Sequence, residues 1–210
     1  MRLILASTSP RRQELLALLG LRFDIVAPPF VEQVVPNRSA EQQAVEFAVG
    51  KATSCIELCP DALILGSDTL ISLGSEVLGK PADLADAESM LRRMAGQIHK
   101  IFTAVALAGP GHERGEVQIA TVSVTMKALN EEALSVYLRT GDSLGKAGAY
   151  SIQGGGAELI EWIEGDYTAA VGLPLRTVAD MLHRHGMPCP VDVDQLYVRK
   201  PYPNWNRFNS

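Results

Sequence analysis

The feature that most constrains the fold is a strand, turn and helix pattern at the start of the chain. Residues 3–6 form a short apolar run, which is typical of a buried strand. In the polar turn that follows, Ser9 fits a helix N-cap and Pro10 fits the first helical position. Leucines then recur at helical spacing until Gly20, a plausible C-terminal stop. The pattern predicts an α/β fold.

The rest of the chain alternates in the same way. Helices are predicted over residues 40–58, 84–94, 131–139 and 175–183, and strands over residues 23–27, 62–66 with a continuation at 70–73, 101–108 and 117–126. Residues 159–164 and 167–171 are expected to pair as a hairpin, while residues 77–81 and 145–156 are expected to be loops. Because residues 122–126 alternate between apolar and polar, at least one strand should be antiparallel, so the sheet should have mixed directions.

Length and charge limit the class of protein. The 210 residues fit one domain, predicted at residues 1–186, with a Pro-, Asn- and aromatic-rich tail at 187–210. No apolar run approaches the ~20 residues of a membrane span, and the N-terminal run is too short for a signal peptide, so we expect a cytoplasmic protein without a membrane partner. A net charge of −5 disfavours a nucleic-acid partner.

The three cysteines carry no paired C-x-x-C signature. Cys55 and Cys59 are either half of a metal site or small apolar fillers, and the second interpretation is favoured because two soft ligands do not complete a zinc site.

Two arginines stand where a helix start disfavours them. Arg11 and Arg12 fall in the first helical turn, next to the positive end of the helix dipole. They are either a solvated surface pair or the partners of an anion, and guanidinium groups suit phosphate oxygens. Lys51, on an otherwise apolar helical stripe, and Lys80, between Gly and Pro, are further cations that face either phosphate or solvent.

Carboxylates and a glycine-rich loop add further candidates. Asp68 directly follows an apolar strand, where α/β folds gather ligands, so it fits a Mg²⁺ ligand, a proton acceptor or an ordinary turn residue. Glu32 is a second candidate carboxylate. Lys146 and Gln153 lie in the glycine-rich loop, which either brings backbone amides and a base-reading amide to a ligand or acts as a hinge.

Six separated segments resemble the motifs of one family in their order and residue identities. They are LASTSPRR at residues 5–12, KA at 51–52, SDT at 67–69, GKP at 79–81, KAGAYSIQG at 146–154 and VGLPL at 171–175. Together they resemble the Maf family of nucleoside triphosphate pyrophosphatases. The resemblance implies an elongated α/β fold related to inosine triphosphatases, with a mixed sheet, flanking helices and a cleft between two lobes. It also implies hydrolysis of the α–β phosphoanhydride to a nucleoside monophosphate and pyrophosphate, with Mg²⁺ or alternatively Mn²⁺.

The resemblance assigns expected roles to residues of this chain. Asp68 matches the catalytic base and Glu32 the acid near the metal, so both are expected metal ligands. The expected substrate-binding residues are Ser7, Ser9, Arg12, Lys51, Lys80 and Lys146. Arg11, Thr69 and Gln153 match the positions that track base choice and resemble the dTTP/UTP-type branch. A homodimer is expected as well.

Two positions depart from the family, which commonly has Glu at residue 50 and often Asp at residue 145, where this chain has Gly50 and Gly145. Glycine at residue 50 removes a potential metal-site carboxylate. Modified pyrimidine triphosphates remain open as further substrates. Two other functions also remain open: a pyrophosphatase for another non-canonical nucleotide such as 7-methyl-GTP, and a nucleotide-sensing division regulator with little turnover.

Overall fold

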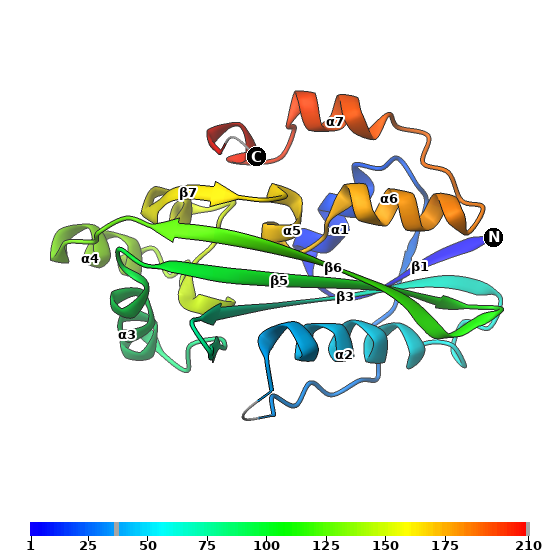
Figure 1. Ribbon diagram of the computed structural model, residues 1–210, viewed down its shortest axis with the longest axis horizontal. Helices are drawn as coiled ribbons and strands as arrows, with labels where there is room; N and C mark the ends of the chain where they lie inside the picture. Colours follow the sequence, from blue (N-terminus) through cyan, green and yellow to red (C-terminus); the bar gives the residue numbers. More distant parts are fainter. Residues whose placement is uncertain (36–37, 209–210) are drawn as a thin grey trace.

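A computed structural model describes residues 1–35 and 38–208, and these residues form an elongated α/β protein built on one sheet (Figure 1). The strands are β1 (Arg2–Ala6), β2 (Asp24–Ile25), β3 (Ala62–Leu73), β4 (Glu76–Leu78), β5 (Ile98–Gly109), β6 (His112–Met126) and β7 (Ile160–Glu164). The helices are α1 (Pro10–Ala17), α2 (Ala40–Thr53), α3 (Leu84–Met94), α4 (Glu131–Arg139), α5 (Tyr167–Val171), α6 (Leu175–Arg184) and α7 (Val193–Arg199), with short 3-10 turns η1 (Ala147–Ala149), η2 (Gly155–Leu159) and η3 (Trp205–Arg207).

The sheet has mixed strand directions, as the sequence predicts. Its order is β2-β1-β3-β5-β6-β7, and β4 pairs with β3 off that path. Strand β1 runs parallel to β2 and β3, whereas β3, β5, β6 and β7 pair antiparallel. The long strands β3, β5 and β6 give the molecule its long axis (Figure 1). The predicted α/β class with a mixed sheet and flanking helices is confirmed.

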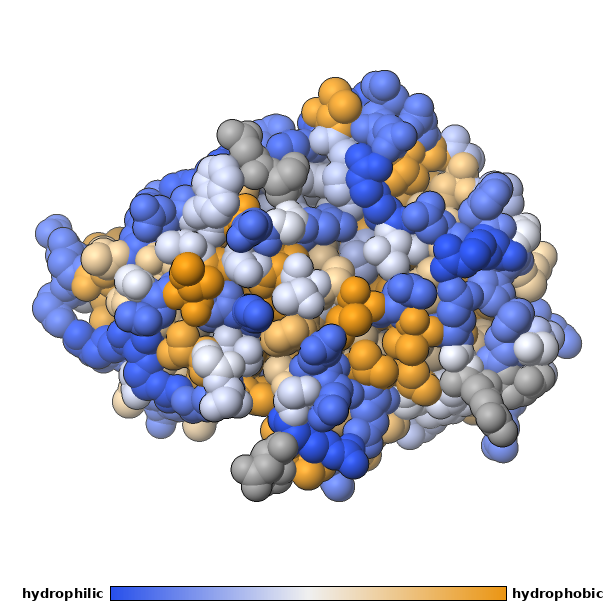
Figure 2. All heavy atoms as spheres, in the orientation of Figure 1, coloured by the Kyte–Doolittle hydropathy of each residue, from blue (hydrophilic) through white to orange (hydrophobic). Residues whose placement is uncertain are grey.

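Apolar side chains form one core on each face of the sheet. Helix α2 covers one face, where Phe47, Ala48 and Ala52 pack against small residues of β5 such as Ala104. Helices α1, α3 and α6 bury leucines such as Leu15, Leu91 and Leu182 on the opposite face. The molecular surface seen in Figure 2 is mostly hydrophilic, with hydrophobic residues gathered over the strands and beside α2. No helix of the described chain combines the length and apolar character that crossing a bilayer requires.

Strand β3 passes the end of its neighbour, and this creates room for a site. The sequence predicts a strand over residues 62–66 with a continuation at 70–73. In the structure residues 62–73 form one strand without a turn at 67–69, because β5 pairs with it through these residues, with Asp68 opposite Ala104. Strand β1 stops earlier, with Ala6 opposite Gly66. Asp68 therefore lies inside β3 and beyond the carboxyl end of β1, not in a turn.

Several predicted elements are wrong in type or extent. Residues 167–171 form helix α5 rather than a hairpin strand, because the Asp166 side chain accepts a hydrogen bond from the amide of Thr168 at 2.8 Å and caps a helix there. The strand partner of β7 is β6. Residues 76–78 form strand β4 in the predicted exposed loop, while the helix predicted to residue 58 ends at Thr53.

The segment that begins at residue 187 packs on the core as far as residue 208, and residues 209–210 of the predicted tail lie outside the described residues. Trp205 is completely buried, and its ring stacks on Tyr167 with 5.7 Å between centroids. Phe208 is buried beside the same tyrosine. The boundary at residue 186 stays a prediction.

Candidate active site

One cavity of about 580 Å³ lies where β3 passes the end of β1. It is lined by every site residue that the sequence predicts, namely Ser7, Ser9, Arg11, Arg12, Glu32, Lys51, Asp68, Thr69, Lys80, Lys146 and Gln153. These residues come from six separate stretches of the chain, so only the fold brings them together. Basic side chains and two carboxylates share this one space.

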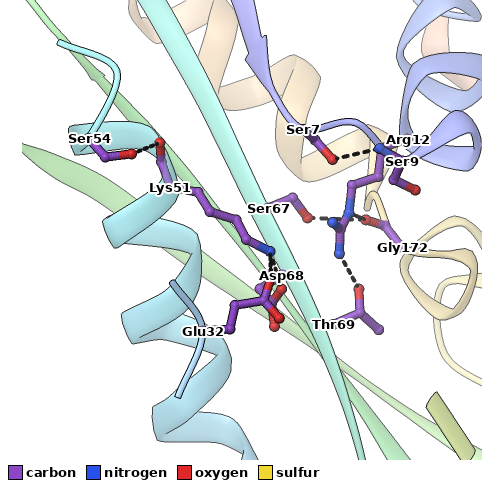
Figure 3. Close-up of polar contacts among 10 residues, drawn as sticks. All are labelled: Ser7, Ser9, Arg12, Glu32, Lys51, Ser54, Ser67, Asp68, Thr69 and Gly172. Carbon is purple, nitrogen blue, oxygen red and sulfur yellow. Dashed lines mark hydrogen bonds and ion pairs between the residues drawn. The ribbon is translucent and has the colours of Figure 1, made fainter. Parts of the chain in front are cut away.

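The side chains of β3 reach both sides of the strand. Successive residues of a strand point to opposite faces, so Asp68 faces α2 while Ser67 and Thr69 face α1 and α5 (Figure 3). Because β1 has ended at Ala6, the cavity extends around the open edge of β3. Groups on both faces of the sheet can therefore act on one ligand.

Lys51 lies between the two carboxylates rather than facing open solvent. Its side chain leaves α2, and its Nζ is 2.5 Å from Oδ1 of Asp68 and 2.5 Å from Oε1 of Glu32 (Figure 3). Partial burial acts to raise the pKa of Glu32, but the hydrogen bond and charge of Lys51, with Lys80 and Arg12, outweigh it and hold that pKa below its ordinary value. Lys51, the charged residue on the otherwise apolar stripe of α2, is thus an ion-pair partner of both carboxylates.

The carboxylates suit a hard divalent cation. Oδ2 of Asp68 is buried and has no hydrogen-bond partner within the described residues. Carboxylate oxygens are preferred ligands of Mg²⁺, which binds through one or two of them and keeps waters and substrate phosphates as its other ligands. Among the side chains that the structure describes, no group of three or more His, Cys, Asp or Glu residues is arranged for a metal. A two-carboxylate site that shares its ion with a phosphate fits the donors at hand.

Arg12 is fixed on the opposite face of β3. Its Nε donates to the carbonyl oxygen of Gly172 at 3.1 Å and its Nη2 donates to Oγ1 of Thr69 at 3.2 Å (Figure 3). Burial lowers the pKa of Arg12 below that of a free guanidinium, and the charge of Asp68 opposes this shift. A guanidinium stays protonated in proteins, so this wall carries a permanent positive charge.

The hydrogen bonds around the hydroxyl of Thr69 have a defined direction. Thr103 donates its hydrogen to the carbonyl oxygen of Ala169 at 2.8 Å, so in the 3.0 Å contact between the two hydroxyls Thr69 is the donor. Oγ1 of Thr69 also accepts from Arg12. A hydroxyl has one hydrogen and two lone pairs, so Thr69 retains one lone pair for a ligand. Sequence reasoning missed Thr103, because a threonine in an apolar strand carries no distinguishing signal.

The remaining cations line the cavity at more exposed places. Lys80 is exposed in the loop after β4. Lys146 forms a 2.9 Å ion pair with Asp142. At the start of α1, Ser9 occupies the N-cap without a side-chain cap bond, and its amide donates to Oγ of Ser7 at 3.2 Å. The first turn of α1 therefore faces the cavity, and the Ser9 side chain does not cap its backbone amides.

The glycine-rich loop contributes a buried amide oxygen. Oε1 of Gln153 is buried and has no hydrogen-bond partner in the described part of the chain. Tyr150 lies in the same wall, and its hydroxyl contacts Nε2 of His99 at 2.7 Å. An unpartnered buried acceptor in a cavity wall is a group that a ligand can satisfy.

Phe30 explains the glycine at residue 50. A Cβ added to Gly50 would lie 2.2 Å from the ring of Phe30, which lines the cavity and also contacts Phe47. Sequence reasoning missed Phe30 as a cavity residue. The signal that could have indicated it is its position directly after Pro28 and Pro29. Cys55 is buried in the apolar core under α2, as the favoured interpretation expects.

Comparison with known proteins assigns the chain to a family. The model of the family described as Maf-like protein matches residues 2–185. The chain belongs to this family. A dTTP/UTP pyrophosphatase of Myxococcus xanthus is 43% identical over 188 residues, covering 90% of this chain and 94% of that protein. A dTTP/UTP pyrophosphatase of Shigella dysenteriae is 43% identical over 181 residues, covering 86% and 91% of the two chains.

The Maf-like chain also has distant neighbours among solved structures. The Staphylococcus aureus Ham1 protein matches with a TM-score of 0.45 and 12% identity, covering 77% of this chain and 81% of that one. A HAM1 protein from Coxiella burnetii matches with a TM-score of 0.42 and 15% identity, covering 60% and 73%.

Proposed function

We propose that this protein is a nucleoside triphosphate pyrophosphatase that hydrolyses dTTP and UTP to the monophosphate and pyrophosphate. Relatives about 40% identical over most of the chain are named for this activity. The observation that carries the proposal is the convergence of Asp68, Glu32, Arg12, Lys51 and Lys80 on one cavity. A space with two carboxylates and several cations suits a polyphosphate together with a divalent ion.

The cations bind and orient the triphosphate in this proposal. Arg12, Lys80 and Lys146 line the cavity from three different segments, so they can contact separate phosphate groups. Their positive charge offsets the charge that develops on the leaving pyrophosphate, an electrostatic contribution typical of phosphoryl transfer. Ser7 and Ser9 add hydroxyl groups at the uncapped start of α1, where anions are favoured.

Asp68 is the proposed general base. Its Oδ2 has no partner within the described residues, while its Oδ1 is held by Lys51. Oδ2 takes a proton from a water molecule whose oxygen attacks the α-phosphorus. The bond from the α-phosphorus to the bridging oxygen then breaks, and pyrophosphate leaves with the electron pair. General-base help of this kind is worth about 10²–10⁴-fold in rate.

Glu32 and Asp68 are the proposed metal ligands. Bound Mg²⁺, or alternatively Mn²⁺, supplies a Lewis acid that withdraws charge from the phosphate oxygens. The carboxylate of Glu32 is held ionised by Lys51, and ionised carboxylates are the form that binds a cation.

Arg11, Thr69 and Gln153 are proposed to select the base. Thymine and uracil present an N–H between two carbonyls. The free lone pair of Thr69 and the amide of Gln153 offer acceptors and donors to that edge. A methylated guanine carries a positive charge and favours an aromatic face with a carboxylate, which these residues do not provide.

The proposal also includes a cytoplasmic homodimer that acts on free nucleotides. The free cysteines Cys55, Cys59 and Cys189 fit a reducing compartment. Ile98 and Trp162, which flank Thr125 in the sheet register, are exposed apolar side chains that a second copy can cover. Sedimentation velocity distinguishes a dimer from a monomer.

Pyrophosphate release tests the proposal directly. The purified protein is incubated with dTTP, UTP, dCTP, dATP, GTP and 7-methyl-GTP, each with Mg²⁺, Mn²⁺ or chelator. We expect pyrophosphate from dTTP and UTP in the presence of metal. Preferential release from 7-methyl-GTP would contradict the base assignment, and binding of dTTP without release from any nucleotide would favour a nucleotide-sensing protein.

A further inference from the structure

Asn204 connects the C-terminal segment to the loop that carries Gln153. Its Nδ2 donates to the carbonyl oxygen of Ile152 at 2.9 Å and to that of Gly154 at 3.2 Å. These two carbonyls belong to the residues on either side of Gln153. One amide group therefore uses both hydrogens to hold the backbone that positions the candidate base-reading side chain.

The amide of Asn204 is held in place by its neighbours. Asn204 has φ 62° and ψ 0°, a left-handed conformation that asparagine tolerates better than most residues. The residue before it accepts a hydrogen bond from the Tyr167 hydroxyl at 2.5 Å through the carbonyl oxygen of Pro203. The residue after it, Trp205, is completely buried against Tyr167. The Nδ2 group is thus preorganised toward the loop.

The held loop is one that needs outside support. Residues 145–156 contain five glycines, and glycine loses more conformational freedom on ordering than other residues. Within the loop, the amide of Gly154 donates to the carbonyl oxygen of Ser151 at 3.2 Å. The two bonds from Asn204 add restraint directly beside Gln153.

The same segment also touches the other side of the cavity. The Tyr202 hydroxyl donates to Oε2 of Glu14 at 2.6 Å, and Glu14 lies on α1, the helix that carries Arg11 and Arg12. Residues 202 and 204 thus contact two of the three elements that supply the candidate base-selecting groups, namely α1 with Arg11 and the loop with Gln153. This segment lies beyond residues 2–185, which the family model matches.

We propose that Asn204 is a positioning residue for nucleobase recognition: it fixes the loop so that Gln153 meets the pyrimidine. This inference rests on the proposed function. Asn204 does not contact Asp68, Lys51 or Glu32 through any hydrogen bond of the described residues. Its loss should weaken base binding and selectivity and leave the chemical step nearly unchanged.

The sharpest variant is Asn204→Asp. Aspartate has the same shape and tolerates the left-handed backbone, but an ionised carboxylate cannot donate and would face two carbonyl oxygens. We expect the KM for dTTP to rise about tenfold, the size of one lost hydrogen bond, while kcat stays within about twofold. The ratio of dTTP to dCTP hydrolysis should fall. Asn204→Gly, which also keeps the backbone conformation, should behave alike and covers the case in which the aspartate variant does not fold.

Arg207→Ala is the matched control. It removes an exposed ion pair with Glu158 from the same segment and leaves Asn204 in place. We expect wild-type KM and base selectivity from this control. If both Asn204 variants keep the wild-type KM and selectivity, or if Arg207→Ala reproduces their effect, the positioning role is refuted.

Calorimetric titration with dTTP separates this inference from the proposed function. If the wild type binds dTTP but releases no pyrophosphate, the proposed function fails, and weaker binding by Asn204→Asp still supports the positioning role. Equal binding by both proteins overturns it. Absence of dTTP binding by the wild type would overturn both.

Discussion

Nζ of Lys51 lies 2.5 Å from Oδ1 of Asp68, and both side chains are almost completely buried. The same Nζ is 2.5 Å from Oε1 of Glu32. One ammonium thus joins two carboxylates and leaves the group with one net negative charge. This arrangement lowers the pKa of Glu32 and holds the two carboxylates close together at the candidate site.

Replacement of Lys51 by methionine should destabilise the fold. Methionine matches the length of the stem but leaves the buried Asp68 without its partner, which typically costs roughly 3–5 kcal/mol. Urea denaturation at pH 7 measures this loss in unfolding free energy.

Lys100→Met is the control for that experiment. Lys100 is exposed on β5, and an exposed substitution usually changes stability by less than about 0.5 kcal/mol. A Lys51→Met protein as stable as this control would show that the buried ion pair does not contribute to the fold.

His99 should make stability depend on pH in the mildly acidic range. Burial lowers the pKa of His99 from 6.5 to about 4, so the unfolded chain binds a proton that the folded protein does not between these values. Stability should therefore be full above pH 6.5 and decrease as the pH falls toward 4, by roughly 3 kcal/mol in all.

Substitution of His99 isolates this effect. The slope of unfolding free energy against pH reports the number of protons taken up on unfolding. In His99→Gln this number should be smaller by about one between pH 6.5 and 4. His183→Gln, at an exposed position, should retain the wild-type slope. Identical slopes in the wild type and His99→Gln would rule out the buried neutral histidine as the source.

Gly50 and Phe30 should be energetically coupled. Alanine normally stabilises a helix by about 1 kcal/mol relative to glycine, but a Cβ at residue 50 would lie 2.2 Å from the Phe30 ring. Gly50→Ala should therefore destabilise the protein and also raise the KM for dTTP, because Phe30 lines the cavity. Thermal melting and kinetics report the two effects.

A double-mutant cycle tests this coupling. In the background of Phe30→Ala the clash is gone, so Gly50→Ala should become stabilising by its helix propensity. Additive effects of the two substitutions would contradict the packing explanation.

The location of the site was predictable from sequence to a useful degree. The turn after residues 3–6 places polar residues beyond β1, and the apolar run before Asp68 marks the strand that carries this carboxylate. The fold brings both groups to one cavity. Lys51 was recognisable as a charge on an apolar helical face. Local patterns of this kind can be recognised in the sequence because they depend only on residues close together in the chain.

Other features depend on contacts between distant residues and could not be predicted. The continuity of β3 through Asp68 comes from pairing with β5, and polar residues in a strand look like a turn without that partner. Helix α5 depends on capping by Asp166, which the sequence also allows as a hairpin turn. The two bonds of Asn204 span about fifty residues, and no local pattern marks them.

Pyrophosphate release from dTTP by Asp68→Asn, compared with the wild type, is the most direct test of the proposed general base. Asparagine keeps the size of the side chain but cannot accept the proton of the attacking water. We expect a loss of at least about 10²-fold in rate, with dTTP binding still measurable by calorimetry. A variant that hydrolyses dTTP at the wild-type rate would contradict the role assigned to Asp68.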